Sequence, residues 1–536
     1  MFTTSWENRY SLPRLPVVTK RAMVATSQPT AAQAGISIIE RGGNAIDAAI
    51  AVAAALTVVE PTCNGIGGDA FAIVWFEGKM FALNGSGPAP SSISIEALKQ
   101  RGFSKMPQRG WETVTVPGIP ASWAALSKRF GKLPLTETLK PAIKLANEGY
   151  AVSYNLAALW EKSYTEYKEK LNKEEFSNWF TTFAPNGRAL QCGEIYSSID
   201  HGRTLDLIAK TDAQAFYKGE LAERIDHFSK QYNAFITKED LANYNVEWIE
   251  PLKADYRGFD VWEIPPNGQG ISVLMALNIL NEIPYIKQQD ETFTHYMIEA
   301  IKLAMGEASH SITEAKLMKT TTEQLLSCGW SQKARNRIGQ NALNPSLEEI
   351  PKGGTVYLAT ADEAGNMVSY IQSNYEEFGS ALVVPKTGIA LQNRGSNFSL
   401  DPNHINALAP GKKTYHTIIP GFITKDGLPV GPFGVMGGFN QPQGHLQILS
   451  NLIDKKLNPQ ATLDAPRWRW LQNKEILVET HFPLHIKKEL LKRGHKVETS
   501  MDLGLFGRGQ IILRKSENGS LIGGCESRTD SLIAVL

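Results

Sequence analysis

The first long apolar patterns of the chain predict two helices. They cover residues 30–41 and 44–60, and Gly42-Gly43 separates them because glycine interrupts a regular helix. The second helix contains the longest apolar run of the chain, Ala48 to Val59, which is rich in alanine. At 12 residues this run is too short to span a bilayer, so we expect a buried helix.

The pattern changes from helices to strands near residue 355. A strand pair is predicted earlier, at residues 71–76 and 79–83, but helical patterns dominate from 135 to 320. Residues 157–180 mix Lys and Glu with aromatic residues, which is typical of a helix with one solvated face. The later segments predict one helix at 442–453 and strands at 355–361, 366–373, 388–392, 417–423, 429–436, 508–513 and 520–535.

This order of elements favours a layered α+β sandwich. Helices gather before residue 355 and strands after it, without the regular βαβ alternation of a parallel-sheet protein. The chain contains no internal repeat, low-complexity tract or long flexible linker. Composition therefore offers no point at which to divide it into separate domains.

Composition and charge exclude some classes of function. The chain has 536 residues, of which 42% are hydrophobic and 20% charged, as in an ordinary soluble globular protein. With 55 basic and 54 acidic residues, its net charge of +1 gives no general attraction to nucleic acid or to an anionic membrane. The N-terminus, Met1 to Arg9, does not show a basic start followed by an apolar core, so we expect no secretory signal.

The cysteines indicate a reducing compartment, which agrees with the absence of a predicted secretory signal. The four of them are far apart and form no CxxC pair, so we expect free thiols in a reducing compartment and a cytoplasmic protein. They are Cys63, Cys192, Cys328 and Cys525.

A candidate for catalysis lies where the first of the late strands begins. Gly353-Gly354-Thr355 places a small hydroxyl residue after two flexible ones. If Thr355 attacked the carbonyl of Gly354, the chain would be cut and Thr355 would become a new N-terminus. A free α-amino group titrates at about 7.7–8.0, so it could accept the proton that a threonine nucleophile must lose. Three residues alone are weak support, because the same sequence occurs in ordinary turns before strands.

Several longer motifs accompany this one. They are Gly42-Gly43-Asn44-Ala45-Ile46-Asp47-Ala48-Ala49, Val58-Val59-Glu60-Pro61, Gly65-Ile66-Gly67-Gly68, Val116-Pro117-Gly118, Gly437-Gly438 and Asp464-Ala465-Pro466-Arg467. With these motifs in order, nearly the whole chain resembles the γ-glutamyltransferase (glutathione hydrolase) family of N-terminal nucleophile hydrolases. Many members of that family are exported, so a chain without a signal is a departure that favours the cytoplasm.

The resemblance implies a fold and a processing event. The fold is a four-layer αββα sandwich, and the chain cuts itself between Gly354 and Thr355. Residues 1–354 would form the large segment and residues 355–536 the small segment, both within one core and associated after cleavage. The partner implied is a small-molecule amide, with no nucleic acid or membrane. No cofactor or metal is expected, and His481 and His485 lack the acidic or cysteine partners of a metal site.

The resemblance also implies the catalytic groups. Thr355 would supply the nucleophile and, after cleavage, the base. Gly437 and Gly438 would offer backbone N–H groups to an oxyanion, although alone they would indicate a plain glycine turn. Ser373 matches a hydroxyl residue that assists self-cleavage, or it is a solvent-facing strand hydroxyl. Whether Asn374 or a neighbour takes the role of a family asparagine stays open.

The predicted substrate pocket departs from the family pattern. Ser86 stands where the family has an arginine that binds the α-carboxylate, and Asn397 where it has an acidic residue for the α-amino group. Arg394 stands where an uncharged side chain is usual, so it could restore the positive charge or form a structural ion pair. His416 and Thr417 replace two serines, and His416 either bonds substrate or is structural.

Three functions remain open at this stage. The first is a self-cleaving γ-glutamyltransferase or glutathione hydrolase-like enzyme that passes an acyl group from an amide to water or an amine through acyl-Thr355. The second is a glutaryl or cephalosporin-type acylase with the same nucleophile, which the altered pocket favours. The third, from another class, is an uncleaved protein that binds a metabolite without catalysis.

Overall fold

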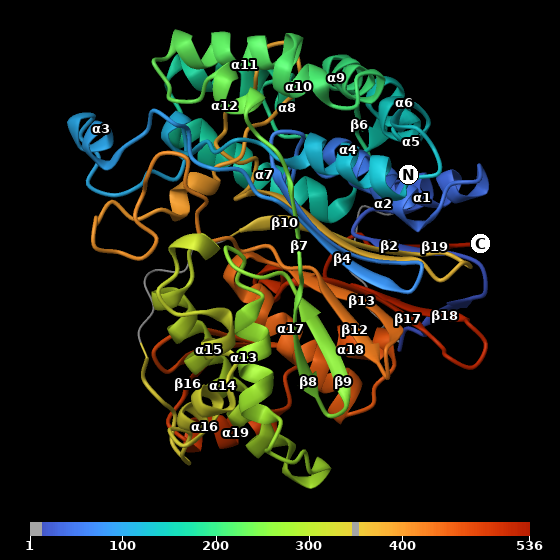
Figure 1. Cartoon of the computed structure of the whole chain (residues 1–536), viewed down its shortest axis with the longest axis vertical. Coiled ribbons are helices and arrows are strands. Elements are labelled where there is room, and N and C mark those ends of the chain that lie inside the picture. The colour runs from blue at the N-terminus through green and yellow to red at the C-terminus, as the bar shows by residue number, and fades with distance from the viewer. Residues whose placement is uncertain (1–12, 346–352) are drawn as a thin grey trace.

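Two antiparallel seven-stranded sheets form the centre of the computed structural model, which describes residues 13–345 and 353–536 (Figure 1). The first sheet runs in the order β19 (Leu532–Val535), β2 (Met23–Thr26), β10 (Gly354–Ala361), β11 (Met367–Tyr375), β3 (Asp69–Phe76), β4 (Lys79–Gly85) and β7 (Glu247–Ile249). The second runs in the order β1 (Val17–Thr19), β18 (Leu521–Cys525), β17 (Arg508–Arg514), β13 (Leu428–Met436), β12 (Gly421–Lys425), β9 (Phe259–Glu263) and β8 (Leu252–Tyr256).

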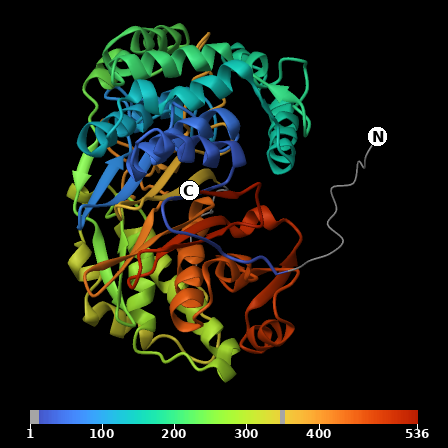
Figure 2. The same cartoon turned by 90° about the vertical axis from the view of Figure 1, so that its right-hand side faces the viewer.

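Helices cover the outer face of each sheet, as both views show (Figures 1 and 2). The helices α1 (Pro29–Glu40), α2 (Ala45–Val59) and α4 (Ile119–Phe130) pack on the first sheet. The helices α13 (Ile271–Leu280), α17 (Gln441–Leu449) and α18 (Pro459–Asp464) pack on the second. Since β10 and β11 also face β13, the layers follow the order helix, sheet, sheet, helix. The predicted four-layer αββα fold is confirmed.

The remaining elements extend these layers. The other helices are α3 (Ile95–Gln100), α5 (Leu135–Thr138), α6 (Lys140–Glu148), α7 (Tyr154–Lys170), α8 (Ser177–Phe183), α9 (Ile199–Lys210), α10 (Gln214–Lys218), α11 (Glu220–Gln231), α12 (Lys238–Ala242), α14 (Asp290–Ser311), α15 (Thr322–Leu325), α16 (Cys328–Arg335) and α19 (Leu484–Lys492). Two small sheets contain β5 (Tyr150–Ala151), β6 (Ile195–Tyr196), β14 (Trp468–Gln472), β15 (Glu475–Glu479) and β16 (Lys496–Ser500).

The alanine-rich helix α2 lies at the centre of one helical layer. Every one of its residues is buried, as its apolar run predicted. Its start is fixed by Asn44, whose side chain accepts hydrogen bonds from the backbone N–H groups of Ile46 and Asp47, while the Asp47 carboxylate accepts from the Asn44 N–H. This reciprocal cap satisfies backbone donors that would otherwise be buried without partners. In the described part of the chain, no helix has both the length and the apolar composition needed to cross a bilayer.

The bond between Gly354 and Thr355 lies within the first sheet. Both sheets contain strands from before this bond and strands from after it: in the first sheet β10 and β11 lie between β2 and β3, and in the second sheet the four strands β18, β17, β13 and β12 lie between β1 and β9. Neither set of strands could form either sheet alone. The bond therefore lies at the start of a central strand and does not separate two compact units.

Some predicted elements differ from the structure. Residues 388–392 form only isolated bridges, because their backbone groups bond to loops: the Gln392 N–H donates to Gly67 O and the Leu391 N–H to Leu382 O. The strand predicted at 417–423 starts only at Gly421, and the one predicted at 520–535 is two strands, β18 and β19, in different sheets. The helix predicted at 442–453 becomes a π-turn after Leu449.

The burial of the aromatic residues of α7 and α8 and the state of the four cysteines are as the sequence predicted. Trp160, Tyr167 and Trp179 are buried against Phe378, while the Lys and Glu residues between them face outward. All four cysteines are free thiols. The residues at the N-terminus on which the expectation about a signal rests lie outside the described ranges.

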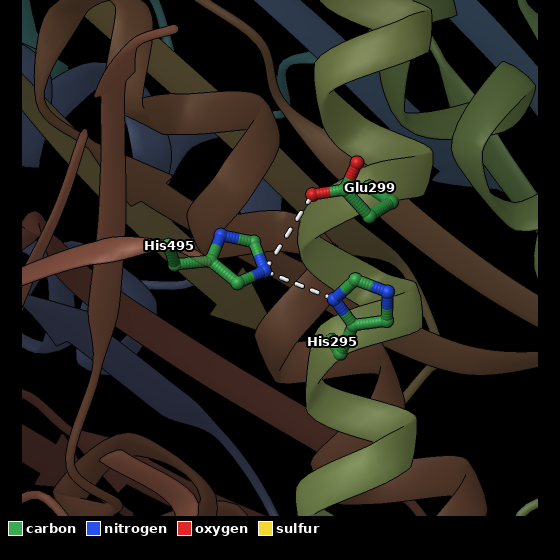
Figure 3. A group of neighbouring side chains, drawn as sticks. All are labelled: His295, Glu299 and His495. Atoms are coloured by element: carbon green, nitrogen blue, oxygen red, sulfur yellow. Dashed lines mark hydrogen bonds and ion pairs between the residues drawn. The ribbon is translucent and has the colours of Figure 1, made fainter. Parts of the chain in front are cut away.

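A buried polar cluster joins α14 to the segment that precedes β16 (Figure 3). His295 Nδ1 lies 2.9 Å from His495 Nε2, and the Lys302 ammonium donates to Glu299 Oε1 at 2.8 Å. Burial lowers the pKa of His295 to about 4 and that of His495 to about 2, so both rings are neutral at neutral pH.

The three side chains drawn in Figure 3 have the spacing of metal ligands, because their ligand atoms all lie within 4.8 Å of one another. The Lys302 ammonium, however, already balances the Glu299 carboxylate. The other carboxylate oxygen accepts from the Leu343 N–H, and His295 Nε2 lies 3.0 Å from Gly339 O. A divalent ion would add unbalanced charge in a buried place. We therefore assign the cluster a structural role in holding residues 339–343.

This cluster predicts how stability depends on pH. Since a histidine of the unfolded chain titrates near pH ~6.5 and these two titrate much lower, acid binds the unfolded state first and the free energy of unfolding falls below that pH. In this range each such histidine makes the free energy of unfolding fall by about 1.4 kcal/mol for each pH unit of acidification. His495→Gln should lower the Tm at neutral pH but flatten its fall between about pH 6 and 4.5.

The matched control is His485→Gln, because His485 is exposed on α19. It should leave both the Tm and its pH dependence as in the wild type. Calorimetry over this range decides the matter, and an unchanged slope in His495→Gln would contradict the prediction.

Candidate functional site

Thr355 lies buried at the start of β10, beside Ser373 on the neighbouring strand β11. The pairing of the two strands shifts register between Gly354 and Val356, so Thr355 occupies an irregular position in the ladder. Its Oγ1 donates to Ser373 Oγ at 3.1 Å, and Ser373 Oγ donates to the carbonyl oxygen of Gly354 at 2.7 Å. Ser373 therefore contacts both the predicted nucleophile and the carbonyl that it would attack.

This geometry suits the first step of self-cleavage. The hydrogen bond from Ser373 draws electron density from the Gly354 carbonyl and favours attack on its carbon. Ser373 Oγ also accepts a hydrogen bond from the Tyr375 N–H at 2.7 Å, which fixes the hydroxyl in place. Ser373 is completely buried, so the solvent-facing alternative for this residue does not apply.

The two glycines that follow β13 lie next to the chain before the bond to be cut. Gly437 and Gly438 have φ values of +140° and +58°, where L side chains are strained. A Cβ atom on Gly353 would come within 3.0 Å of the Gly438 Cα, so the two segments are in close contact. Gly438 begins a short 3₁₀ turn, whose first N–H groups have no partner inside the turn. This position is compatible with the predicted oxyanion role.

Arg394 is a fully buried cation, and two of its three side-chain nitrogens have no hydrogen-bond partner among the described residues. Its Nη1 donates to Thr417 Oγ1 at 2.8 Å, and its guanidinium lies 4.2 Å above the Tyr375 ring. Among the described residues, its Nε and Nη2 have no hydrogen-bond partner. Burial lowers the pKa of Arg394 to about 10, and Asp69 is the charge that most opposes this change. No acidic side chain forms an ion pair with it in the described chain, so it is not the structural ion pair considered from the sequence.

Two other predicted pocket residues, Asn397 and Ser86, use their side chains in hydrogen bonds within the protein. Asn397 Oδ1 accepts from the Tyr375 hydroxyl at 2.6 Å, and Asn397 Nδ2 donates to Tyr415 O at 3.1 Å. Ser86 Oγ donates to Asn84 Oδ1 at 2.6 Å. The structure thus gathers Asn397 near Arg394 through Tyr375, while Ser86 belongs to a separate hydrogen-bond network.

His416 uses both of its ring nitrogens within the protein. Its Nε2 lies 3.0 Å from Asp69 Oδ2, and its Nδ1 accepts from the Ile418 N–H at 3.3 Å. Burial holds the pKa of His416 well below its usual value and raises the pKa of Asp69 to about 7. With both nitrogens occupied, His416 has the contacts of a structural residue, which is the second of the two roles considered for it.

The comparisons with known proteins decide the family. Residues 31–536 match the family model described as gamma-glutamyltranspeptidase. The chain belongs to this family. It is 36% identical over 526 residues to a glutathione hydrolase-like proenzyme of Bacillus subtilis, an alignment that covers 96% of this chain and 98% of that protein. It is 32% identical over 531 residues to an oxamate amidohydrolase proenzyme of Klebsiella pneumoniae, with 96% and 99% covered.

A solved structure agrees with these relatives. The crystal structure of a cephalosporin acylase from Bacillus halodurans superposes with a TM-score of 0.97 at 53% identity, covering 100% of this chain and 99% of that one. Members of the gamma-glutamyltranspeptidase family are self-cleaving enzymes with an N-terminal nucleophile. This chain is accordingly such an enzyme and not the non-catalytic binding protein that we considered.

One residue of the site was not predicted. Gln269 is completely buried, and its Nε2 donates to Thr417 O at 2.6 Å and to Gly438 O at 3.0 Å. Its Oε1 accepts from the Tyr415 hydroxyl at 3.3 Å. Gln269 thus ties the turn that holds the oxyanion candidates to the partner of Arg394. The segment Pro265-Pro266-Asn267-Gly268-Gln269-Gly270, which leads into α13, was the available signal in the sequence.

Self-cleavage gives the first test of this site. Wild-type protein should yield fragments near ~39 and ~20 kDa, with threonine at the new N-terminus, whereas Thr355→Ala should stay a single chain of 59.0 kDa. Ser373→Ala should slow cleavage by about 10²–10³, the usual effect of losing one such donor. Intact mass against time measures both. As a control, Ser369→Ala removes another buried hydroxyl of β11 and should cleave at the normal rate.

Gln269 gives a second test. Gln269→Leu should lower kcat by about 10- to 100-fold and change KM by less than about threefold, because it removes the hydrogen bonds that join Gly438 O, in the oxyanion turn, to Thr417 O. The matched control is Gln447→Leu, which also loses two bonds to backbone carbonyls, those of Gln443 and Trp468. That control should cost stability and leave kcat unchanged. Equal losses of kcat in both variants would show that Gln269 has only a structural role.

Proposed function

We propose that this enzyme hydrolyses amides whose acyl group ends in a carboxylate and carries no α-ammonium, such as glutaryl amides. The observation that carries this proposal is the buried guanidinium of Arg394, with Nε and Nη2 unpaired among the described residues. A buried donor without a partner is costly, and a buried cation more so. A carboxylate that accepts two parallel hydrogen bonds from Arg394 would remove both costs.

The same pocket disfavours an ammonium group. Asn397 stands where an acidic residue would be needed to pair it, and the Asn397 amide already bonds to Tyr375 and Tyr415. An α-ammonium bound beside Arg394 would add a second positive charge in a region of low dielectric, where like charges repel strongly. A γ-glutamyl group differs from a glutaryl group by this ammonium alone, so the charge of the pocket separates the two.

The chemistry follows from the groups around Thr355. After cleavage, the free amine of Thr355 takes the proton of its own hydroxyl, and Oγ1 attacks the amide carbon. The N–H groups of Gly437 and Gly438 would stabilise the oxyanion. The amine leaves with the proton, and water, or a second amine, then attacks the acyl ester on Thr355. The two fragments stay together in this scheme, because both sheets contain strands from each.

The named relatives support more than one acyl donor. The similarity at 53% identity to a cephalosporin acylase favours the glutaryl-type substrate. The similarity to a glutathione hydrolase-like proenzyme favours γ-glutamyl compounds such as glutathione, which remain the second candidate. We also propose a cytoplasmic location, because the four free cysteines suit a reducing compartment.

Glutaryl-p-nitroanilide and γ-glutamyl-p-nitroanilide test the proposal, since they differ only by the α-ammonium. We expect wild-type kcat/KM to favour the glutaryl compound by at least about tenfold, and Arg394→Ala to lower it for that compound by about 10- to 100-fold. Arg394→Lys should retain part of the activity, because lysine keeps the charge without the fork of donors.

A control arginine excludes a general loss of stability. Arg129 lies over the rings of Phe81 and Trp248, and Arg129→Ala should leave the ratio of the two substrates unchanged. If Arg394→Ala also leaves that ratio unchanged, Arg394 does not bind the carboxylate. A wild-type preference for the γ-glutamyl compound would favour glutathione-type substrates instead.

A further inference from the structure

A wide groove lies against the predicted pocket. Its volume is about 1180 Å³, and it lies between residues 102–108, the C-terminal end of α14 and residues 396–406. Pockets for small ligands usually measure about 300–1,000 Å³. A glutaryl-sized acyl group would fill only a small part of this space, so the groove has room for the other half of the substrate.

The groove is lined by two residues that lie next to the catalytic groups, although Thr355, Gly437, Gly438 and Arg394 are not part of its lining. Phe439 lines it and directly follows Gly438, the oxyanion candidate. Asn397 also lines it and bonds to the hydroxyl of Tyr375, the ring on which Arg394 stacks. Since Arg394 is fully buried, an acyl chain bound to it points inward. The amine half of the amide then extends outward from Thr355 into the groove.

An aromatic stack forms part of the groove wall. The rings of Tyr415 and Phe439 are nearly parallel, with centroids 5.7 Å apart and an angle of 13° between planes. Tyr415 is only 8% exposed, and its hydroxyl bonds to Gln269, so this ring is held in place. Phe439 is half-buried and is the more accessible member of the pair. Its free surface would extend the stack to one more ring.

Other apolar side chains surround this stack. Phe103, Met305, Ile312 and Phe398 contribute to the lining of the same groove. The lining is mixed, since Lys105, Glu376 and Asp401 also lie along the groove. Met305, Ile312 and Phe398 are almost fully buried, so Phe103 and Phe439 are the rings that keep accessible surface. A ring placed against these two would bury apolar surface, which favours a leaving group with an aromatic or heteroaromatic body.

We infer that this groove is a leaving-group subsite, in which an aromatic or heteroaromatic amine stacks on Phe439 while the acyl carbonyl lies at Thr355. The inference rests on the proposed function in one respect: the acyl group is taken to point inward, toward Arg394. The groove would then select the amine half of the substrate, independently of the carboxylate that Arg394 would bind.

A series of amides with one acyl group and three amines tests the subsite. The amines are ethylamine, which has no ring, and 2-phenylethylamine and 2-(naphthyl)ethylamine, whose rings lie two carbons from the nitrogen, so the basicity of the three leaving groups stays similar. We expect wild-type kcat/KM to rise by at least about tenfold from the ethyl to the naphthylethyl amide, chiefly through KM, as stacking and burial of a ring predict. Released amine is quantified by mass spectrometry.

Two variants of Phe439 separate ring stacking from other effects. Phe439→Ala should reduce the tenfold gain to less than about threefold while its kcat on the ethyl amide stays within about threefold of wild type, and Phe439→Tyr should retain the gain. As a control, Phe259→Ala removes a half-buried ring of β9 that contacts Lys425, and it should leave the gain unchanged.

Several results would overturn the inference. One is a wild-type enzyme that does not discriminate among the three amines. Another is a Phe439→Ala variant that loses kcat equally on all three, which would make Phe439 a support of the oxyanion turn. The series can be built on a glutaryl or a γ-glutamyl group, whichever the enzyme accepts, so failure of the carboxylate proposal and failure of the subsite give different results.

Discussion

The active site depends on one hydroxyl, that of Ser373, and on the strand pairing that holds it. This hydroxyl donates to the Gly354 carbonyl at 2.7 Å and accepts from Thr355 at 3.1 Å. A single atom can do both only because β10 and β11 are neighbours at the centre of a sheet and their register shifts at Thr355. Helices on one side and the second sheet on the other keep the site dry, and hydrogen bonds that involve the reacting groups are stronger there than in water.

The site also requires a fixed distance between the turn at Gly438 and the residues around Arg394. Gln269 fixes this distance, because its side-chain nitrogen donates hydrogen bonds to both Gly438 O and Thr417 O. Gln269 precedes the cleavage bond in the chain, whereas both of its acceptors follow it. The segment before the bond therefore orders a site that belongs mainly to the segment after it.

Charge decides what such a site can accept. Arg394 is buried and has no ion pair among the described residues. Three groups offset the free energy of burying its charge: the Thr417 hydroxyl, the Tyr375 ring and the nearby Asp69. The carboxylate of Asp69 is itself held by His416 and Gln392, so it is not free to close on the guanidinium. The guanidinium of Arg394 thus stays unpaired among the described residues, and this unpaired charge is the basis of the proposal that the pocket binds an anion.

The sequence by itself determined the family and the fold class, because these depend on short local motifs and on the order of helices and strands, and it predicted Thr355 as the nucleophile. Gly354-Thr355 before a strand, Gly437-Gly438 after one and the alanine-rich run of α2 all keep their predicted places. Only the tertiary structure decided which polar side chains are free. From the sequence, Arg394 and His416 could each contact substrate or be structural, yet Arg394 keeps unpaired donors among the described residues and His416 bonds to Asp69 and Ile418. Partners of this kind come from distant parts of the chain, as Gln269 does, and no local pattern encodes them.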